Sequence, residues 1–218
     1  MKLLGSGSWR LCFILSALFF LVGGPQHPGG TMAEMLGDPK WVPAHSLMLA
    51  GFVVLLIGLL LYSRTASLPH RTQRCVRFAI IGTALQAMEM AMHTAAVVDH
   101  DHLVAGQATP VLTMHLWLAV FFYPIFGVTL TGFIIAGMRD HVLGSPWIAW
   151  LGIVGVLAQG VAPLLVIVLK IAGASILFPF LLLFALWLVL AGIWPLSVKG
   201  EQGMHREHLD EPLRGMGK

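Results

Sequence analysis

The chain has 218 residues, of which 57% are hydrophobic and only 11% carry a formal charge. A soluble domain has about 25% charged residues, so this chain cannot cover a fold of its size with a hydrated surface. The mean hydropathy of +0.84 points the same way. The composition excludes a soluble enzyme, a disordered protein and a nucleic-acid-binding domain. The net charge of +3 is better explained by orientation in a lipid bilayer, which is the expected partner.

The first 24 residues combine a basic start with a short apolar run, at 11–22, and two following glycines. This order is typical of a cleaved signal peptide, and it is equally compatible with a short first membrane helix. Both interpretations of residues 1–24 stay open at this point. Residues 25–42 are rich in Pro and Gly and are expected to form an arm on the outer side.

Five later runs each have the roughly 20 mostly apolar residues that a membrane-crossing helix needs. They lie at about 43–63, 76–98, 110–138, 147–171 and 174–196. The region 43–198 is therefore predicted to form one all-α bundle of an integral membrane protein. The bundle has five or six transmembrane helices, depending on the fate of residues 1–24. Residues 199–218 are polar and are expected to form a disordered cytoplasmic tail.

The charges of the connecting segments predict the orientation of the helices. The segment 64–77 carries four arginines and no acid, which places it in the cytoplasm. The segment 99–109 carries Asp99 and Asp101 without any Lys or Arg, which suits the outer side. Alternation then puts the C-terminus, and the N-terminus if it is uncleaved, in the cytoplasm. The expected location is the inner or plasma membrane, crossed several times.

Three histidines and one glutamate lie inside the predicted spans toward their outer ends: His45, Glu89, His93 and His115. Such side chains are costly in a membrane and tend to be functional. At 1.5 Å per residue, His93 and His115 both lie roughly 7–8 Å from the outer ends of their helices. His45 is slightly shallower, and Glu89 lies one turn deeper. We therefore expect three histidines from three helices to meet in one layer of the outer leaflet.

Helical periodicity places polar side chains on one face of the second predicted span. Gln86, Glu89, His93 and His100 fall within about 60° of one another, at 100° per residue. The rest of that helix is Ala, Met, Val and Ile. A narrow polar stripe on such a helix is expected to face the bundle interior or a water-filled cavity.

Imidazole and carboxylate groups together are typical of a transition-metal or haem site. We expect His93 and His115 to bind a cofactor. His45 and Glu89 would complete a Cu or Zn site, or two of the three histidines would hold a b-type haem. Several methionines lie near these residues and would favour Cu(I): Met88, Met90, Met92 and Met114. A redox or metal-handling role would follow.

Two other interpretations of the polar cluster remain open. It could lock the bundle of a non-catalytic membrane subunit or assembly factor, with a protonated Glu89 paired to Gln159 or to a hydroxyl. It could also serve a proton-coupled carrier in which Glu89 and the histidines change protonation. The segment 99–102, Asp-His-Asp-His, is expected to be a hydrated loop, with weak binding of divalent metal as the alternative.

Glycines in the predicted spans allow helices to approach closely. Their positions are compatible with packing inside one bundle, with a homo-oligomer, or with assembly into a larger membrane complex. The glycines concerned form three pairs: Gly51 and Gly58, Gly127 and Gly132, and Gly152 and Gly155.

Overall fold

The computed structural model describes residues 7–65 and 68–194. Within these ranges the chain is an all-α bundle without β-strands, and six of its helical segments are long and apolar enough to cross a membrane. This confirms the predicted fold class of a multi-helix membrane bundle. The tail predicted at 199–218 lies outside the described residues.

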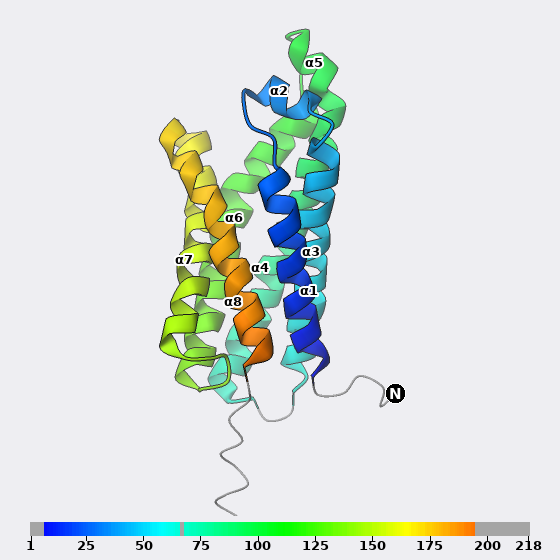
Figure 1. The fold of residues 1–218 in the computed structure, drawn as a ribbon. Helices are drawn as coiled ribbons and strands as arrows, with labels where there is room; N and C mark the ends of the chain where they lie inside the picture. Colours follow the sequence, from blue (N-terminus) through cyan, green and yellow to red (C-terminus); the bar gives the residue numbers. More distant parts are fainter. Residues whose placement is uncertain (1–6, 66–67, 195–218) are drawn as a thin grey trace, which may run out of the picture.

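Six long helices follow one another along the bundle (Figure 1). They are α1 (Ser8–Gly23), α3 (Trp41–Ser63), α4 (His70–Ala95), α6 (Pro110–Arg139), α7 (Pro146–Pro163) and α8 (Leu181–Ile193). Shorter segments extend or connect them: η1 (Gly24–Gln26), α2 (Met32–Gly37), η2 (Ala96–Asp99), α5 (His100–Val104), the π-helical turn η3 (Leu164–Val168) and the 3-10 segment η4 (Ala172–Phe180). Helix α4 continues through η2 into α5, so the second predicted span is longer at both ends than expected.

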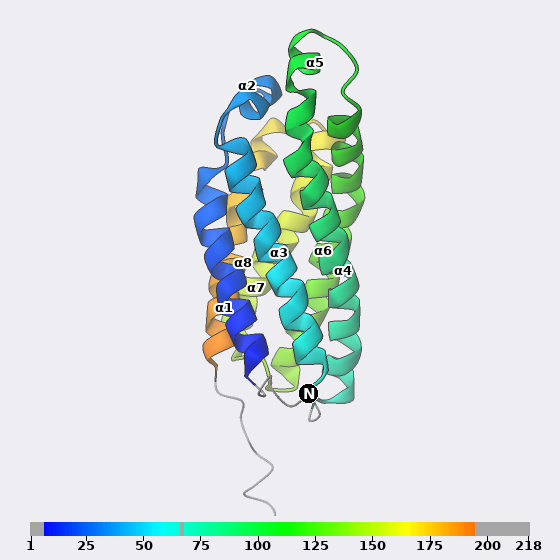
Figure 2. The same ribbon diagram turned by 90° about the vertical axis from the view of Figure 1, so that its right-hand side faces the viewer.

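The six long helices close into a ring in chain order, in which each helix packs against the next and α8 packs back against α1 (Figures 1 and 2). Arg10 ties this seam, because its guanidinium donates hydrogen bonds to the carbonyl oxygens of Trp194, at 2.6 Å, and Gly192, at 3.4 Å. Helix α1 is thus an integral part of the bundle.

Aromatic rings fill the axis of the bundle. Four phenylalanines, one each from α1, α3, α6 and α8, form a closed circle of ring contacts with centroid distances between 4.8 and 6.2 Å: Phe20, Phe52, Phe126 and Phe184. A second aromatic group lies nearer the start of α1 and consists of Trp9, Phe13, Tyr62, Phe133 and Trp187. These layers separate the two ends of the bundle.

The outer arm is more ordered than its composition suggests. Its helix α2 begins with a capping box, in which the Thr31 backbone N–H donates to the Glu34 carboxylate at 2.7 Å and the Glu34 N–H donates to the Thr31 hydroxyl. The bond from the Thr31 backbone lowers the pKa of the exposed Glu34 carboxyl. Together, α2 and α5 cover one end of the bundle (Figure 1).

Glycines set the spacing of α6, α7 and α8. A Cβ at Gly127 would lie 2.9 Å from the Val156 carbonyl oxygen, and a Cβ at Gly155 would lie 2.5 Å from the Phe184 backbone nitrogen. Gly51, Gly58 and Gly152 likewise meet side chains of this same chain. Gly132 has no neighbour within 4 Å of its Cβ position, so the expectation that this glycine mediates a close contact inside the bundle was wrong.

We expect Gly155→Ala to lower the free energy of unfolding by about 1–3 kcal/mol, because the added methyl group forces α7 and α8 apart. Gly132→Ala is the matched control, since its methyl group enters open space and alanine favours a helix. Thermal unfolding of the two variants in detergent measures the difference. Equal stability of the two variants would contradict the close packing at Gly155.

The arginines that predicted the orientation lie at one end of the bundle. Arg64 ends α3, Arg71 lies in the first turn of α4, and Arg139 ends α6. This is also the end at which α1 begins and α8 finishes (Figure 1). Arg10, in the first turn of α1, adds to the same basic end.

We expect this basic end to face the cytoplasm, because Lys and Arg are retained on that side during insertion. Reporter fusions after residue 70 and at the C-terminus should then read cytoplasmic, whereas a fusion within 99–109 should read external. Opposite readings at these positions would place the end covered by α2 and α5 in the cytoplasm.

Candidate metal centre

The three histidines and the glutamate meet near the end of the bundle that α2 and α5 cover. His45 lies near the start of α3, Glu89 and His93 near the end of α4, and His115 near the start of α6. His93 Nε2 lies 2.8 Å from His45 Nε2, and His93 Nδ1 lies 2.8 Å from His115 Nε2. His115 Nδ1 lies 2.7 Å from Glu89 Oε1. The three helices therefore bring together the three histidines that the sequence placed in one layer and Glu89, which it placed one turn deeper.

Close polar contacts link the four side chains to the Trp41 backbone. The Trp41 carbonyl oxygen can only accept, so His45 Nδ1, at 2.6 Å, donates to it. His45 Nε2 then accepts a hydrogen bond from His93 Nε2. His93 Nδ1 lies near both ring nitrogens of His115, at 2.8 Å from Nε2 and 3.3 Å from Nδ1, and is in line with neither of their outward directions.

Gln86 is a further partner of Glu89 at the deeper end of the cluster. Its Nε2 donates to Glu89 Oε2 at 2.9 Å. Gln159, considered above as the partner of Glu89, instead donates to the Phe178 carbonyl oxygen of η4. That pairing was therefore wrong, and the partners of Glu89 are Gln86 and His115.

The side chains of the cluster are largely buried. Glu89 and His45 have no exposed surface, and His115 is 5% exposed. The Trp41 indole stacks on His93 with the two ring planes 10° apart and their centroids separated by 4.8 Å. This stacking fixes the plane of the His93 ring, and with it the directions of both ring nitrogens.

Three donor atoms of the cluster are spaced as the ligands of one small ion. His93 Nδ1 and His115 Nδ1 lie 3.3 Å apart, and Glu89 Oε1 lies 2.7 Å from His115 Nδ1 and 3.9 Å from His93 Nδ1. Glu89, His93 and His115 therefore bring three donor atoms close enough together for one ion, which the His115 ring would reach by turning its Nδ1 lone pair toward the other two.

The methionine side chains that would favour Cu(I) do not point toward one common site. Met88 and Met114 are 59% and 52% exposed on the outside of the bundle, whereas Met90 is buried in the main apolar core. The donor set near Glu89 consequently consists of nitrogen and oxygen atoms. Such donors suit Zn²⁺ or Cu²⁺ better than Cu(I).

His27 is a fourth histidine beside the cluster and was not expected there. It follows η1 in the arm, and its ring packs edge-on against His45 with centroids 4.8 Å apart. Packing around the imidazole lowers its pKa, although a hydrogen bond to the Pro28 carbonyl opposes this effect. The arm has no helical period, so the sequence held no signal that would place this ring.

The segment 99–102, which was expected to be a hydrated outer loop, is helical. Two of its side chains make contacts within the fold. Asp99 is buried and accepts a hydrogen bond from the Leu112 backbone N–H, at 2.8 Å, in the first turn of α6. His100 packs against Gly37 of α2 and does not join the polar stripe of Gln86, Glu89 and His93. The 3-10 turns of η2 change the helical phase between His93 and His100, which removes His100 from that face.

We expect Asp99→Ala to lower stability by about 0.5–2 kcal/mol, because the Leu112 N–H would lose the acceptor that caps α6. Asp101→Ala is the matched control, since the Asp101 side chain is 98% exposed. Thermal unfolding of both variants in detergent makes the comparison. Equal losses in the two variants would show that the bond from Leu112 to Asp99 does not stabilise α6.

No protein-family model, no curated protein and no solved structure matches this chain. What the cluster does must therefore follow from its own side chains. Their nitrogen and oxygen atoms lie close enough together to share a proton or a cation.

Proposed function

We propose that this chain is a multi-pass membrane protein that binds a divalent transition-metal ion, Zn²⁺ or Cu²⁺, through Glu89, His93 and His115. The observation that carries the proposal is the meeting of one carboxylate and two imidazoles, with donor atoms within 4.8 Å of one another, inside the membrane-spanning bundle. With the orientation predicted from the loop charges, the site lies in the outer leaflet.

When an ion enters the site, a proton leaves it. The cation takes the place of the proton between Glu89 and His115, and Glu89 becomes a carboxylate that neutralises part of the ionic charge. Two neutral imidazoles complete the set of three protein ligands. Gln86 keeps its hydrogen bond to the second carboxylate oxygen, which is the supporting contact that metal-bound carboxylates usually have.

The same distances argue against a haem. Two axial nitrogens on opposite sides of an iron must lie about 4 Å apart, twice a metal–nitrogen bond, with the macrocycle between them. The histidine nitrogens lie 2.8 Å apart in both pairs, and the rings of His45 and His93 are in direct contact. A single ion fits between these side chains, whereas a porphyrin would require their separation.

The aromatic layers favour metal handling at one end of the bundle over transport through it. The circle of Phe20, Phe52, Phe126 and Phe184 lies between the cluster and the basic end. Gly82 lies two helical turns from Glu89 on α4, toward the basic end, and packs next to the Phe126 backbone. An ion would therefore enter and leave on the side of α2 and α5, as in a binding or delivery protein.

We expect wild-type protein, purified in detergent and stripped with a chelator, to bind Zn²⁺ or Cu²⁺ when dialysed against the metal. Glu89→Gln keeps the shape of the side chain and removes its charge, so the affinity should fall at least about tenfold. Elemental analysis after desalting gives the metal content. Apo-protein unfolding should change little, because a protonated Glu89 already resembles glutamine.

The control is His141→Asn at the opposite end of the bundle. His141 has a positive φ of 58°, which asparagine tolerates, and its loss should leave the metal content unchanged. Unchanged metal content in folded Glu89→Gln protein would remove Glu89 from the site. Absence of bound metal in the wild type would leave the cluster with a structural role in joining α3, α4 and α6.

A further inference from the structure

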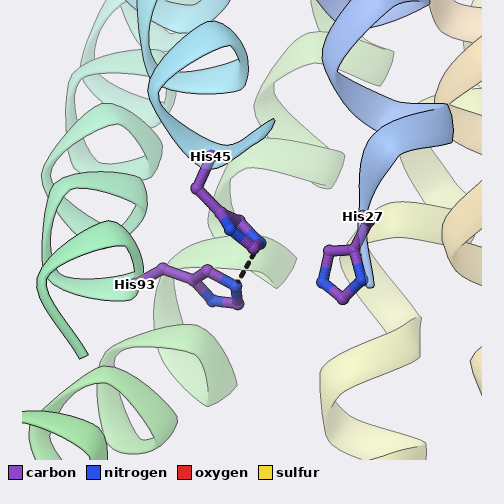
Figure 3. A group of neighbouring side chains, drawn as sticks. All are labelled: His27, His45 and His93. Carbon is purple, nitrogen blue, oxygen red and sulfur yellow. Dashed lines mark hydrogen bonds between the residues drawn. The ribbon is translucent and has the colours of Figure 1, made fainter. Parts of the chain in front are cut away.

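A second group of donors lies on the other side of His93. His27, His45 and His93 each offer a ring nitrogen, and these three atoms lie within 4.8 Å of one another. Figure 3 shows the three rings facing a common region between α3, α4 and the arm. His93 reaches this region through Nε2, whereas it contacts Glu89 and His115 through Nδ1.

The supporting contacts of His27 and His45 are those of metal-binding histidines. His27 Nδ1 donates to the Pro28 carbonyl at 2.7 Å, and His45 Nδ1 donates to the Trp41 carbonyl at 2.6 Å. A metal-bound imidazole almost always donates its second N–H to a carbonyl or carboxylate in this way. Both rings therefore hold an unprotonated Nε2 ready to bind an ion.

From this geometry we propose a second metal site formed by Nε2 of His27, His45 and His93, in which His93 bridges two ions through its two ring nitrogens. The bridge rests on the proposed function, because it needs the first ion at Glu89 and His115. The first ion binds the lone pair of His93 Nδ1. The second ion binds Nε2 and displaces its proton to water, so that His93 becomes an imidazolate shared by the two cations.

His45 and His93 require only a small adjustment to share an ion, and the ring nitrogen of His27 lies within 4.8 Å of theirs. A tetrahedral ion with bonds of about 2.0 Å holds two ligand nitrogens about 3.3 Å apart. His45 Nε2 and His93 Nε2 are joined by a 2.8 Å hydrogen bond in the empty site, so about 0.5 Å of opening admits the ion. His27 is exposed, which gives water and the ion access from the arm and leaves room for a water as fourth ligand.

The second site differs from the first because one of its ligands lies in the arm. His45 and His93 lie on long helices, but His27 follows the short segment η1 and precedes α2. The ligand that completes the second site therefore belongs to the connection between two spans. The first site is buried among helices, and the second faces the solvent, as expected if ions pass from the second to the first.

The test is the number of ions bound by the full-length protein in detergent after loading with Zn²⁺ and desalting. We expect two ions in the wild type and one in His27→Ala, which removes a ligand of the second site only. Glu89→Gln should also retain one ion, and the double variant none. His102→Ala, an exposed histidine of α5, is the matched control and should bind two. Size-exclusion chromatography and circular dichroism verify folding, and His27→Gln serves if His27→Ala misfolds.

The outcomes separate the second site from the first. One ion in the wild type that survives His27→Ala but is lost in Glu89→Gln overturns the second site and keeps the proposed function. One ion that is lost in His27→Ala but survives Glu89→Gln keeps the second site and overturns the first, and with it the bridge. No bound ion in any variant overturns both.

Cu²⁺ tests the bridge itself. Two Cu²⁺ ions joined by an imidazolate lie about 6 Å apart, given bonds of about 2.0 Å, and their electron spins couple. The electron paramagnetic resonance signal per copper should therefore be weaker in the doubly loaded wild type than in His27→Ala. Equal signals per copper would overturn the bridging role of His93.

Discussion

The structure depends on one constraint, which is that polar side chains buried in an apolar bundle are held by one another. Glu89, His115, His93 and His45 are in contact across three helices, with Gln86 at one end of the group and the Trp41 carbonyl at the other. Because the membrane interior offers little water, removal of any member takes a polar neighbour away from the others. These contacts therefore join α3, α4 and α6 at the same time as they assemble the donor atoms.

Packing below the cluster supports this arrangement. Aromatic rings occupy the axis, and glycines let α6, α7 and α8 approach until backbone atoms nearly touch. The cluster thus rests on a closely packed base at the level of Phe126, with an apolar interior beneath it. A charged ion is easier to accept near the end of such a bundle, where water is close, than at its centre.

The features that the sequence predicted correctly are those that the regular geometry of an α-helix determines. A rise of 1.5 Å per residue and a turn of 100° were enough to bring together His45, His93 and His115, because long helices are rigid. They could not place His27, which follows an irregular connection, or foresee that the chain beyond His93 stays helical but changes phase in η2. Gly132 shows the same limit, since the pattern of small residues does not say which side of a helix has a neighbour.

The order of the helices along the chain also bears on how the protein is made. All residues of the cluster, from His27 to His115, belong to the first four long helices or to the arm between them. They are therefore synthesised and inserted before α7 and α8. The contact between α1 and α8 forms later, because the carbonyl oxygens that accept hydrogen bonds from Arg10 belong to Gly192 and Trp194. The donor atoms can thus meet while the ribosome is still completing the chain, and the ring of helices closes around an already assembled cluster.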